Sequence, residues 1–471
     1  MYGEFPATKI MAELEKDSLL PAILFRTARK QCDMDVERLA RSRVGRLKKN
    51  DQQKLEATLK GIIDKYGFQE ELILAHPHYQ ALIQTGAGAH HAGQLLIWRL
   101  ILEELMSAGV LKMLIATGTV AAGVDFPARS VVITAHSKRG SDGFKVLSPS
   151  EFQQMSGRAG RRGKDSVGVC VIAPTPFCDA RIIHRVASQP PEPLRSAYFA
   201  APSTVLNLLK FRSVDDLKFT VQKSLGAFLD RKSASELRSQ AAALEQRLKE
   251  DDSLSERDRK LMSKRARRML REAAALELRQ EHYLEQSLRG LERLGHIENG
   301  KLTEKGSWAA HLCTTLVLEL AEAIDDGLFD DLGVETVAAL VASIAADPHR
   351  TYYSLQENPV TPEQLAELQR IVERVAALYQ RPNDVVVSVV PDAATTVVLW
   401  IHSENWNEYA AYLRLAGVAE GDAARLISQT ADHLNQISRL TETHPELAYT
   451  AAEARRLLMK PPLTEVIAIA D

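Results

Sequence analysis

The sequence has little of what marks secreted, membrane-spanning or zinc-binding proteins. Of its 471 residues only 4 are cysteines, and none of them forms a Cys-x-x-Cys pair. Zinc sites and disulfide frameworks need cysteines at close spacing, so we expect reduced, buried thiols and no metal site. No run of about 18 apolar residues occurs, and the start, MYGEFPATKI, has no apolar signal-peptide core. We therefore expect a cytoplasmic protein without a membrane span.

An excess of charge of one sign is absent as well. The chain has 59 Lys and Arg against 61 Asp and Glu, which gives a net charge of −2. The average electric field around the protein is therefore weak, and any binding to nucleic acid must come from local basic patches. Apolar residues are plentiful at 45%, and the length suits about three or four globular domains.

What the sequence does contain is a basic, glycine-rich decapeptide, QMSGRAGRRG, at 154–163. It is too polar and too flexible for a core, yet strand-forming residues follow at 167–172, which places it at the rim of a sheet. Arg158 and Arg161 are three residues apart, so on a helix both guanidinium groups can face one anion. A phosphate is the natural target, although a decapeptide alone also fits a solvated basic helix start.

A second polar stretch, ATGTVAAGVDFPAR, lies at 116–129. It follows the apolar residues 111–116, which predict a buried strand, so Thr117 and its neighbours stand at the carboxyl end of that strand. Ligands of open α/β sheets bind outside the carboxyl ends of the strands. We therefore expect this stretch and the decapeptide to face one ligand surface.

Together the two stretches resemble motifs V and VI of superfamily 2 (DEAD/DEAH-box) helicases, in the superkiller-like branch that includes exosome-associated RNA helicases. The resemblance implies that Arg158 and Arg161 are arginine fingers for the γ-phosphate of ATP. It also implies that Gln154 helps to position the attacking water and that Thr117 belongs to the nucleic-acid side. The implied catalytic and nucleotide-binding residues are Gln154, Arg158, Arg161, Gly123 and Asp125.

Two further stretches extend the resemblance to nucleic-acid binding. PAILFRTARKQCD at 21–33 resembles motif IV, with Ala28 where the family usually has serine and with Arg29 implied to contact nucleic acid. His90 and His91 open a His-His-Ala-Gly stretch. Neighbouring histidines in an extended segment point to opposite faces, which argues against a metal site. The likeness to the family instead implies that the backbone here meets nucleic-acid phosphate, with His91 among the binding residues.

The sequence also lacks both motifs that hold ATP and Mg²⁺ in such enzymes. No G-x-x-x-x-G-K-[ST] occurs, and no acidic box such as D-E-x-H follows a strand. In the family these motifs belong to a first RecA-like domain, whereas the present residues resemble the second. We therefore expect the cofactors ATP and Mg²⁺ to need a first RecA-like domain in cis or in trans, and the chain alone to hydrolyse no ATP.

Hydrophobic patterns and the resemblance together predict an α/β plus α fold. Residues 1–180 alternate strands and helices, as a parallel sheet requires, and resemble the second RecA-like domain. Residues 181–230 have a helical pattern and, with 286–308, resemble a winged helix, whose wing is a hairpin that turns at Asn299-Gly300. Residues 309–471 resemble the family's helical, ratchet-type domain.

An insertion at 231–285 interrupts the expected winged helix. Apolar residues recur at 4-3-4 spacing on two arms, which predicts an antiparallel coiled-coil hairpin, and Ser255 with Asp258 predicts a cap for the second arm. The seam residues are Leu237, Ala241, Leu244, Leu248, Met262, Ala266, Met269, Ala273, Leu276 and Tyr283. Eukaryotic relatives carry a stalk and arch at this place. The second arm is basic, and a solvated face and an RNA contact both stay open as interpretations.

The C-terminal residues carry the last part of the resemblance. TVVLWIHSENWNEYAAYL at 395–412 and EGDAARLISQTADHLNQI at 420–437 resemble helices of a domain in which one helix acts as a ratchet against bases. The resemblance implies base contacts for Arg425 and Glu322. Arginine can stack on bases and therefore suits single strands.

The resulting prediction is the C-terminal part of an ATP-dependent helicase that acts as a monomer on single-stranded RNA. Two alternatives stay open. One is a non-catalytic, nucleic-acid-binding or regulatory subunit that works in trans. The other is a relative that unwinds DNA, because no motif in the sequence reads the 2′-hydroxyl of RNA.

Overall fold

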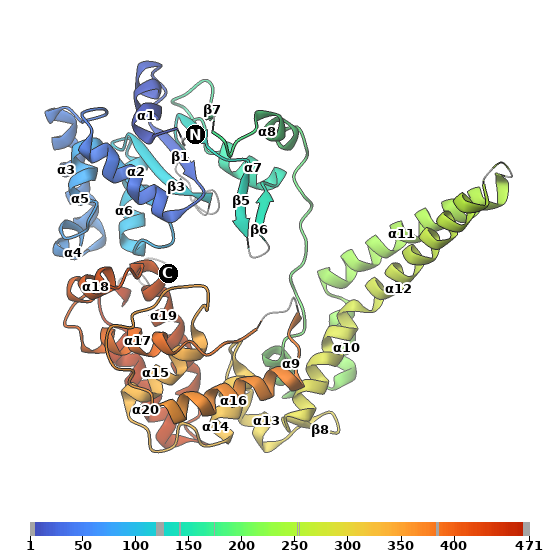
Figure 1. The fold of residues 1–471 in the computed structure, drawn as a ribbon. Helices are drawn as coiled ribbons and strands as arrows, with labels where there is room; N and C mark the ends of the chain where they lie inside the picture. The colour runs from blue at the N-terminus through green and yellow to red at the C-terminus, as the bar shows by residue number, and fades with distance from the viewer. Residues whose placement is uncertain are drawn as a thin grey trace.

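A computed structural model describes residues 5–118, 127–140, 143–173, 175–251, 253, 255–382 and 386–464. These residues form an α/β domain, a long helical hairpin and an all-helical domain (Figure 1). The α/β domain, blue to teal, lies next to the helical domain, orange to red, and the green and yellow hairpin projects away from both. None of the described helices combines the length and the apolarity that a bilayer span requires.

The α/β domain contains a five-stranded sheet in the order β2-β3-β1-β4-β7, in which every neighbouring pair is parallel. The first four strands along the sheet are almost wholly buried, as expected when helices cover both faces of a parallel sheet. The parallel sheet predicted for residues 1–180 is therefore confirmed. The strands are β1 (Ala22–Arg26), β2 (Ala87–His90), β3 (Met113–Thr117), β4 (Ser130–Ile133) and β7 (Val169–Ile172).

Helices cover the sheet on both sides, and alternate residues of β1 pack against different ones. Ala22 and Leu24 pack with α1 and α2, whereas Ile23 and Phe25 pack with α3 and α6. A turn at residues 75–78 separates two short helices, α4 and α5, because Pro77 interrupts helical structure there. The helices are α1 (Ala7–Lys16), α2 (Arg29–Arg41), α3 (Lys49–Tyr66), α4 (Glu70–Leu74), α5 (Tyr79–Thr85), α6 (Leu96–Ser107), α7 (Pro149–Ser156) and α8 (Ala180–Ala187).

A small antiparallel hairpin projects from the sheet between β4 and α7 (Figure 1). It consists of β5 (Ser137–Gly140) and β6 (Gly143–Val146). The side chain of Phe144 is highly exposed there, with 78% of the residue's surface accessible.

The cysteines differ from the expectation of buried thiols. Cys32 is buried in α2, but Cys170 and Cys313 are exposed and Cys178 is partly exposed. Cys170 lies on β7, which is the edge strand of the sheet, and this position leaves one side of the strand uncovered. A run of strand-forming residues does not by itself reveal whether a strand is central or at an edge.

Residues 189–201 form an extended strap that leads from α8 to the helical part of the chain (Figure 1). The expectation of a helical segment throughout 181–230 is wrong for this stretch. Pro190, Pro191 and Pro193 explain the difference, because proline disfavours helical geometry in the residue before it and lacks the N–H that a helix needs.

The strap leads into a small region that also contains the expected hairpin. Asn299 and Gly300 have φ values of 52° and 73°, which is the left-handed geometry of a two-residue type I′ turn, so the predicted turn is confirmed. The elements of this region are α9 (Pro202–Leu209), α10 (Val214–Gln222), β8 (Ile297–Glu298), β9 (Lys301–Leu302) and α13 (Glu304–Ala309).

The predicted coiled-coil hairpin is confirmed as α11 (Leu225–Glu250) packed against α12 (Glu256–Arg293). Its most deeply buried seam positions are small residues, Ala234, Ala241, Ala266 and Ala273, which allow the two helices to lie close together. Ser255 caps α12 by accepting the Asp258 N–H, as expected. The helix runs without a break through the boundary expected at 285, so one helix serves both the hairpin and the region of β8 and β9.

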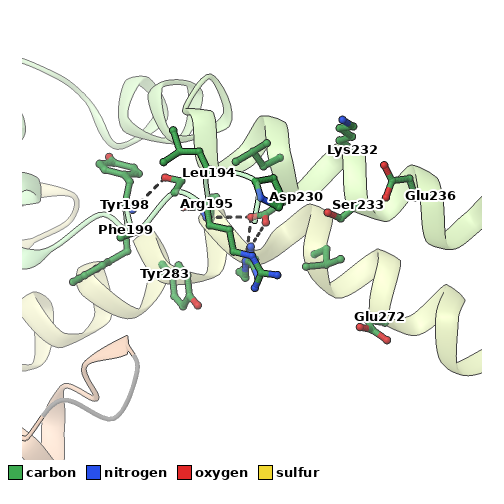
Figure 2. Close-up of a pocket in the computed structure, with 18 of the residues that line it drawn as sticks. Leu194, Arg195, Tyr198, Phe199, Asp230, Lys232, Ser233, Glu236, Glu272 and Tyr283 are labelled. Carbon is green, nitrogen blue, oxygen red and sulfur yellow. Dashed lines mark hydrogen bonds and ion pairs between the residues drawn. The ribbon is translucent and has the colours of Figure 1, made fainter. Parts of the chain in front are cut away.

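The base of the hairpin is fixed by a buried polar cluster (Figure 2). The Asp230 carboxylate accepts hydrogen bonds from Arg279 Nε and Gln280 Nε2, both at 3.1 Å. The strap and both arms line a cavity of about 660 Å³ beside this cluster. Figure 2 shows Tyr198 and Phe199 of the strap on one side of the cavity and Glu236 and Glu272 on the two arms.

The helical domain is built around α15, which is buried along most of its length. The segment 395–412 is split into two helices by a turn at residues 403–405, whereas α19 has the bounds that its sequence pattern suggests. The helices are α14 (Val317–Asp325), α15 (Val334–Ala345), α16 (Pro362–Leu378), α17 (Pro391–His402), α18 (Trp406–Leu415), α19 (Glu420–Ile437) and α20 (Pro445–Leu458).

Candidate nucleic-acid and phosphate sites

Each of the two polar stretches of the α/β domain runs from the carboxyl edge of the sheet to the amino edge. Thr117 ends β3 and pairs in register with Arg26 at the carboxyl edge. Ala128 precedes β4, whose first residue pairs with Ala22 at the amino edge. The two levels are more than about 13 Å apart, because each strand residue adds roughly 3.3 Å. The two stretches share a cavity at the carboxyl edge through Gly118 and Gln154, whereas Ala128 and Arg158 lie together at the amino edge. Gly123 and Asp125 lie outside the described residues.

The arginine-rich stretch is held at the amino edge by backbone hydrogen bonds. Ala128 N–H donates to Arg158 O at 2.9 Å, and Gly160 N–H donates to Ala128 O at 2.7 Å. Glycine is needed in this packing, because a Cβ on Gly168 would lie 2.3 Å from Ala159 O. Arg158 is partly buried where α7 ends. Gly160 of the motif and Gly168 beyond it thus let the two backbone segments pack closely beside Arg158.

Arg161 has a carboxylate partner in the same loop. Its Nε and Nη2 donate to the two oxygens of Asp165 at 2.8 and 2.9 Å, and its backbone N–H donates to Asp165 Oδ2 at 3.0 Å. Arg129 also reaches Asp165, at 3.1 Å. The hydrogen bonds from Arg161 hold the pKa of this carboxyl well below its usual range. In this structure Arg161 therefore bonds to Asp165, and a phosphate would have to replace that carboxylate.

Gln154 lies one helical turn before Arg158 and lines a different space. It borders a cavity of about 400 Å³ at the carboxyl ends of β1, β3 and β4, together with Thr27, Gly118 and Thr134. The sequence grouped Gln154 with the two arginines, whereas the structure places it beside this carboxyl-edge cavity. The difference arises because α7 runs from the carboxyl edge of the sheet toward the amino edge.

Arg29 stands at the start of α2, close to the carboxyl end of β1. Its N-cap residue, Ala28, makes no side-chain hydrogen bond to the helix, and the first turn contains no acidic residue. A helix start of this kind keeps unpaired N–H groups and a partial positive charge, both of which favour a phosphate. The alanine that replaces the family's usual serine therefore leaves the end of the helix uncapped.

The α/β domain and the helical domain meet beside Arg29. Arg29 Nη1 donates to Asp422 Oδ2 at 2.6 Å, and Gly421 N–H donates to Gly93 O at 3.0 Å. A Cβ on Gly421 would lie 2.3 Å from Ala92 O, so only glycine fits this close approach. The resemblance implied that the backbone of the His-His-Ala-Gly stretch meets phosphate. In this structure Gly93 of that stretch instead accepts a hydrogen bond from the N-terminal end of α19.

Three arginines from separate helices gather at this junction. Arg99 of α6 is partly buried, and burial lowers its pKa; the charge of Glu103 opposes this shift, whereas the charges of Arg425 on α19 and Arg29 on α2 add to it. Arg99 Nε is buried and has no hydrogen-bond partner among the described residues. Arg425 is exposed. We call Arg29, Arg99 and Arg425 the junction arginines. The repulsion among them is a cost that a bound polyanion would remove.

The sequence did not reveal Arg99. It lies in an apolar helix whose other residues pack on the sheet, and nothing in its neighbourhood distinguishes it from a surface arginine. Only the approach of α19, more than three hundred positions later in the chain, brings it near Arg425. No local pattern contains that information.

The paired histidines face in opposite directions, as predicted. His90 Nε2 lies 2.6 Å from Glu103 Oε1, and His91 Nε2 lies 2.9 Å from Asp33 Oδ1. Burial raises the pKa of Asp33, but the hydrogen bond and charge of His91 outweigh this effect and the pKa is lowered. With only 3% of its surface exposed, His91 does not present its side chain to a ligand. In this structure His91 instead bonds to the side chain of Asp33 on α2.

Glu322 does not reach a surface where it could contact a base. Its carboxylate is buried and lies 2.6 Å from Lys305 Nζ, 3.2 Å from His296 Nε2 and 3.1 Å from Arg374 Nη2. Burial opposes its ionisation, yet the hydrogen bonds from His296 and Lys305 lower its pKa. The expectation of a base contact is corrected accordingly: Glu322 ties the region of β8 and β9 to the helical domain.

Comparison with known proteins shows which domain families the chain matches. Residues 82–163 match the model of the helicase conserved C-terminal domain, and residues 299–465 match that of the DSHCT (NUC185) domain. The two matched segments carry the arginine-rich stretch and α19 respectively. The chain thus combines a helicase C-terminal domain with a DSHCT domain.

Several similar proteins indicate which group of helicases the chain resembles. Probable helicase HelY of Mycobacterium tuberculosis (strain ATCC 25618 / H37Rv) is 31% identical over 201 residues, which cover 43% of this chain and 22% of that protein. Human Superkiller complex protein 2 is 30% identical over 246 residues, 51% of this chain and 19% of that protein. Exosome RNA helicase MTR4 of Mus musculus is 30% identical over 220 residues, 47% of this chain and 21% of that protein.

The chain belongs to the superkiller-like branch of superfamily 2 helicases and corresponds to the C-terminal region of such a protein. The matched residues span about a fifth of the length of these relatives.

Proposed function

We propose that the chain is the part of an ATP-dependent RNA helicase that holds single-stranded RNA and supplies arginines to a nucleotide bound on another RecA-like domain. The observation that carries this proposal is the group of junction arginines, Arg29, Arg99 and Arg425, where the α/β domain meets the helical domain. The printed names of the similar proteins, which include an exosome RNA helicase, favour RNA as the nucleic acid.

The junction suits a single strand because its charges come from both domains. Arg29 sits at an uncapped helix start that can bind phosphate through its N–H groups, and Arg99 has a buried Nε without a partner among the described residues. Arg425 is exposed on α19 and is free to lie against a base or a phosphate. In this proposal α19 is the helix that contacts bases. The region of α9, α10, α13, β8 and β9 is a winged helix that packs beside the helical domain.

The amino edge of the sheet is the proposed nucleotide side. ATP and Mg²⁺ would be held by a RecA-like domain with its own phosphate-binding loop, and the family's chemistry there is transfer of the γ-phosphoryl group to water. Arg158 is fixed by its backbone bonds to Ala128, and Arg161 would leave Asp165 for the more highly charged phosphate. Guanidinium groups at that place stabilise charge that develops in the transition state.

The two edges are linked by one short piece of chain. Thr117 ends β3 at the carboxyl edge, and Ala128, which bonds to Arg158, stands at the amino edge only eleven residues later. A shift of the arginine loop on nucleotide binding would move Ala128, which follows Thr117 by only eleven residues in the sequence. This short link is the proposed path from ATP hydrolysis to movement of the strand.

One contact favours the non-catalytic alternative. Asp165 neutralises Arg161 within the chain, as expected of an arginine that has no phosphate to meet. In that case the chain would bind nucleic acid and regulate another protein without taking part in hydrolysis. Mutation of the arginines distinguishes the two functions, and the expected result is given in the Discussion.

Binding of a short single strand tests the proposed function. Replacement of Arg99 and Arg425 by alanine should weaken binding of an RNA of about 12 nucleotides roughly tenfold and reduce the salt dependence by up to about 0.7 per lost phosphate contact. The measurement is fluorescence anisotropy at two salt concentrations. The control replaces Lys54 and Lys60, two exposed cations of α3, and should bind like the unmodified chain.

A parallel titration with DNA of the same sequence separates the alternatives. Tighter binding of RNA supports the RNA helicase, and equal binding supports a relative that unwinds DNA. If the unmodified chain binds neither strand, or if the control loses as much affinity as the double variant, the proposed role of the junction is wrong.

A further inference from the structure

We infer that the second arm of the helical hairpin binds the phosphate backbone of a nucleic-acid duplex. The surface consists of Lys260, Lys264, Arg267 and Arg271 on α12, which we call the basic stripe. This inference rests on the proposed function, because the basic stripe would hold the same nucleic acid at a second place.

The local charge of α12 differs sharply from that of the whole chain. Between Asp258 and Glu272 the helix carries seven cations and no carboxylate, whereas the complete chain has a net charge of −2. The seven are Arg259, Lys260, Lys264, Arg265, Arg267, Arg268 and Arg271. Like charges three or four residues apart destabilise a helix, so this composition is not what stability alone would favour.

The basic stripe faces away from the other arm. Its members are spaced 4-3-4 along α12, as are the seam residues Met262, Ala266, Met269 and Ala273. The stripe is displaced from the seam by two residues, which corresponds to about half a turn of helix. All four stripe residues are exposed, while Ala266 and Ala273 are buried against α11. The charges therefore form a line on the outer face of the hairpin.

Most of the basic stripe has no partner of opposite charge. Lys260 lies 2.9 Å from Glu256, in the first turn of α12. For Lys264, Arg267 and Arg271, no carboxylate lies within ion-pair distance in the part of the chain that the structure describes. Arg259 is different, because it donates to Leu248 O at 3.0 Å and Asp251 O at 2.8 Å and so clamps the tip of the hairpin. It is therefore not part of the stripe.

The dimensions of the stripe suit a duplex. Its first and last residues are eleven positions apart, which is about 16 Å along a helix. A duplex carries one negative charge per about 1.7 Å of its axis, so several phosphates face a line of this length. Residues 256–282 contain no Phe, Tyr or Trp, so no aromatic side chain of this arm can stack on a base. Contact with the backbone of a duplex is the recognition that cations alone provide.

The position of the hairpin agrees with this ligand. Figure 1 shows that the hairpin extends away from both domains, so the stripe lies outside the junction that would hold the single strand. At the base of the hairpin the positive face ends, because Glu272 and Glu236 flank the cavity there (Figure 2). A duplex lying along the stripe would therefore contact the outer part of the hairpin and leave its single-stranded end to the junction.

The test compares two RNA probes on the complete chain. One is a single strand of about 12 nucleotides, and the other is a duplex of about 16 base pairs that carries the same strand as a tail. The variant is Lys264→Ala/Arg267→Ala/Arg271→Ala, in which alanine preserves the helix. The control is Lys49→Ala/Lys54→Ala/Lys60→Ala on α3, which removes the same charge from an exposed helix. Circular dichroism verifies that both variants keep their helix content.

The hairpin variant should bind the tailed duplex about tenfold more weakly at roughly 100 mM salt, and the slope of log affinity against log salt should fall by about 2 to 3. Its affinity for the single strand and both affinities of the control should not change. The inference is overturned if the hairpin variant binds the tailed duplex normally, as it would if the stripe served an acidic protein, or if the control loses affinity equally. Failure of the unmodified chain to bind the single strand would instead contradict the proposed function.

Discussion

Replacement of Arg158 by alanine is expected to reduce ATP hydrolysis by about 10³- to 10⁵-fold in a protein that joins this chain to an ATP-binding RecA-like domain. Two backbone hydrogen bonds between its loop and Ala128 hold the backbone of Arg158 at the amino edge, from which its side chain would reach the nucleotide. Preorganised positive charge lowers the energy of a transition state without a cost for reorganisation. Replacement of Arg161 should give a loss of the same order. Steady-state phosphate release measures both.

Arg162 is the matched control, because it is an exposed arginine in the same loop. Its replacement by alanine should leave hydrolysis close to that of the unmodified protein. Affinity for a short single strand should not change in any of the three variants, since the loop lies at the edge of the sheet opposite to Thr117. Normal hydrolysis in the Arg158 and Arg161 variants would show that the arginine edge does not serve a nucleotide, and would favour the non-catalytic alternative.

Replacement of Gly421 by alanine should weaken binding of single-stranded RNA by about 100-fold. The new Cβ would lie 2.3 Å from Ala92 O and 2.6 Å from Gln94 O, and these backbone oxygens cannot turn aside as a side chain can. The start of α19 must then move away, with loss of the hydrogen bond to Gly93 O and of the ion pair between Arg29 and Asp422. Arg425 would leave the other two junction arginines.

Small-angle scattering should show a larger radius for this variant, and anisotropy should show the loss of affinity. Gly61→Ala is the control, because nothing lies within 4 Å of the new Cβ and alanine favours the helix that contains it. If Gly421→Ala keeps both the compact shape and the affinity, the contact between the two domains is not what positions α19 for the strand.

The parts of the fold that could be predicted are those set by local patterns. Short apolar runs predict the parallel strands, and the 4-3-4 spacing predicts the seam of the hairpin. The turn at Asn299-Gly300 is predicted because an Asn-Gly pair favours left-handed backbone geometry. The strap could have been recognised from its prolines, and the pair of Arg161 and Asp165 from its spacing of four residues. The helical interpretation of residues 181–230 overlooked the prolines of the strap. The assignment of Arg161 to a phosphate overlooked Asp165 as its partner.

Other features depend on how distant segments meet, and no local signal predicts them. The register of the parallel strands places Thr117 and Arg158 at opposite edges. Docking of α19 brings Arg425 to Arg99 and pairs Arg29 with a residue 393 positions away. Glu322 is suited by type to contact a base, yet Lys305, Arg374 and His296 surround its carboxylate and bury it. Tertiary structure decides each of these outcomes.

The claim that a single strand passes the junction of the two domains has a direct test in photocrosslinking of 4-thiouridine RNA to the complete chain, followed by identification of the modified peptides. The account predicts crosslinks in residues 90–99, which include Arg99, and in residues 420–430, which include Arg425. Crosslinks confined to the arginine loop at 158–165 or to the edge strand β7, with none at the junction, would contradict it.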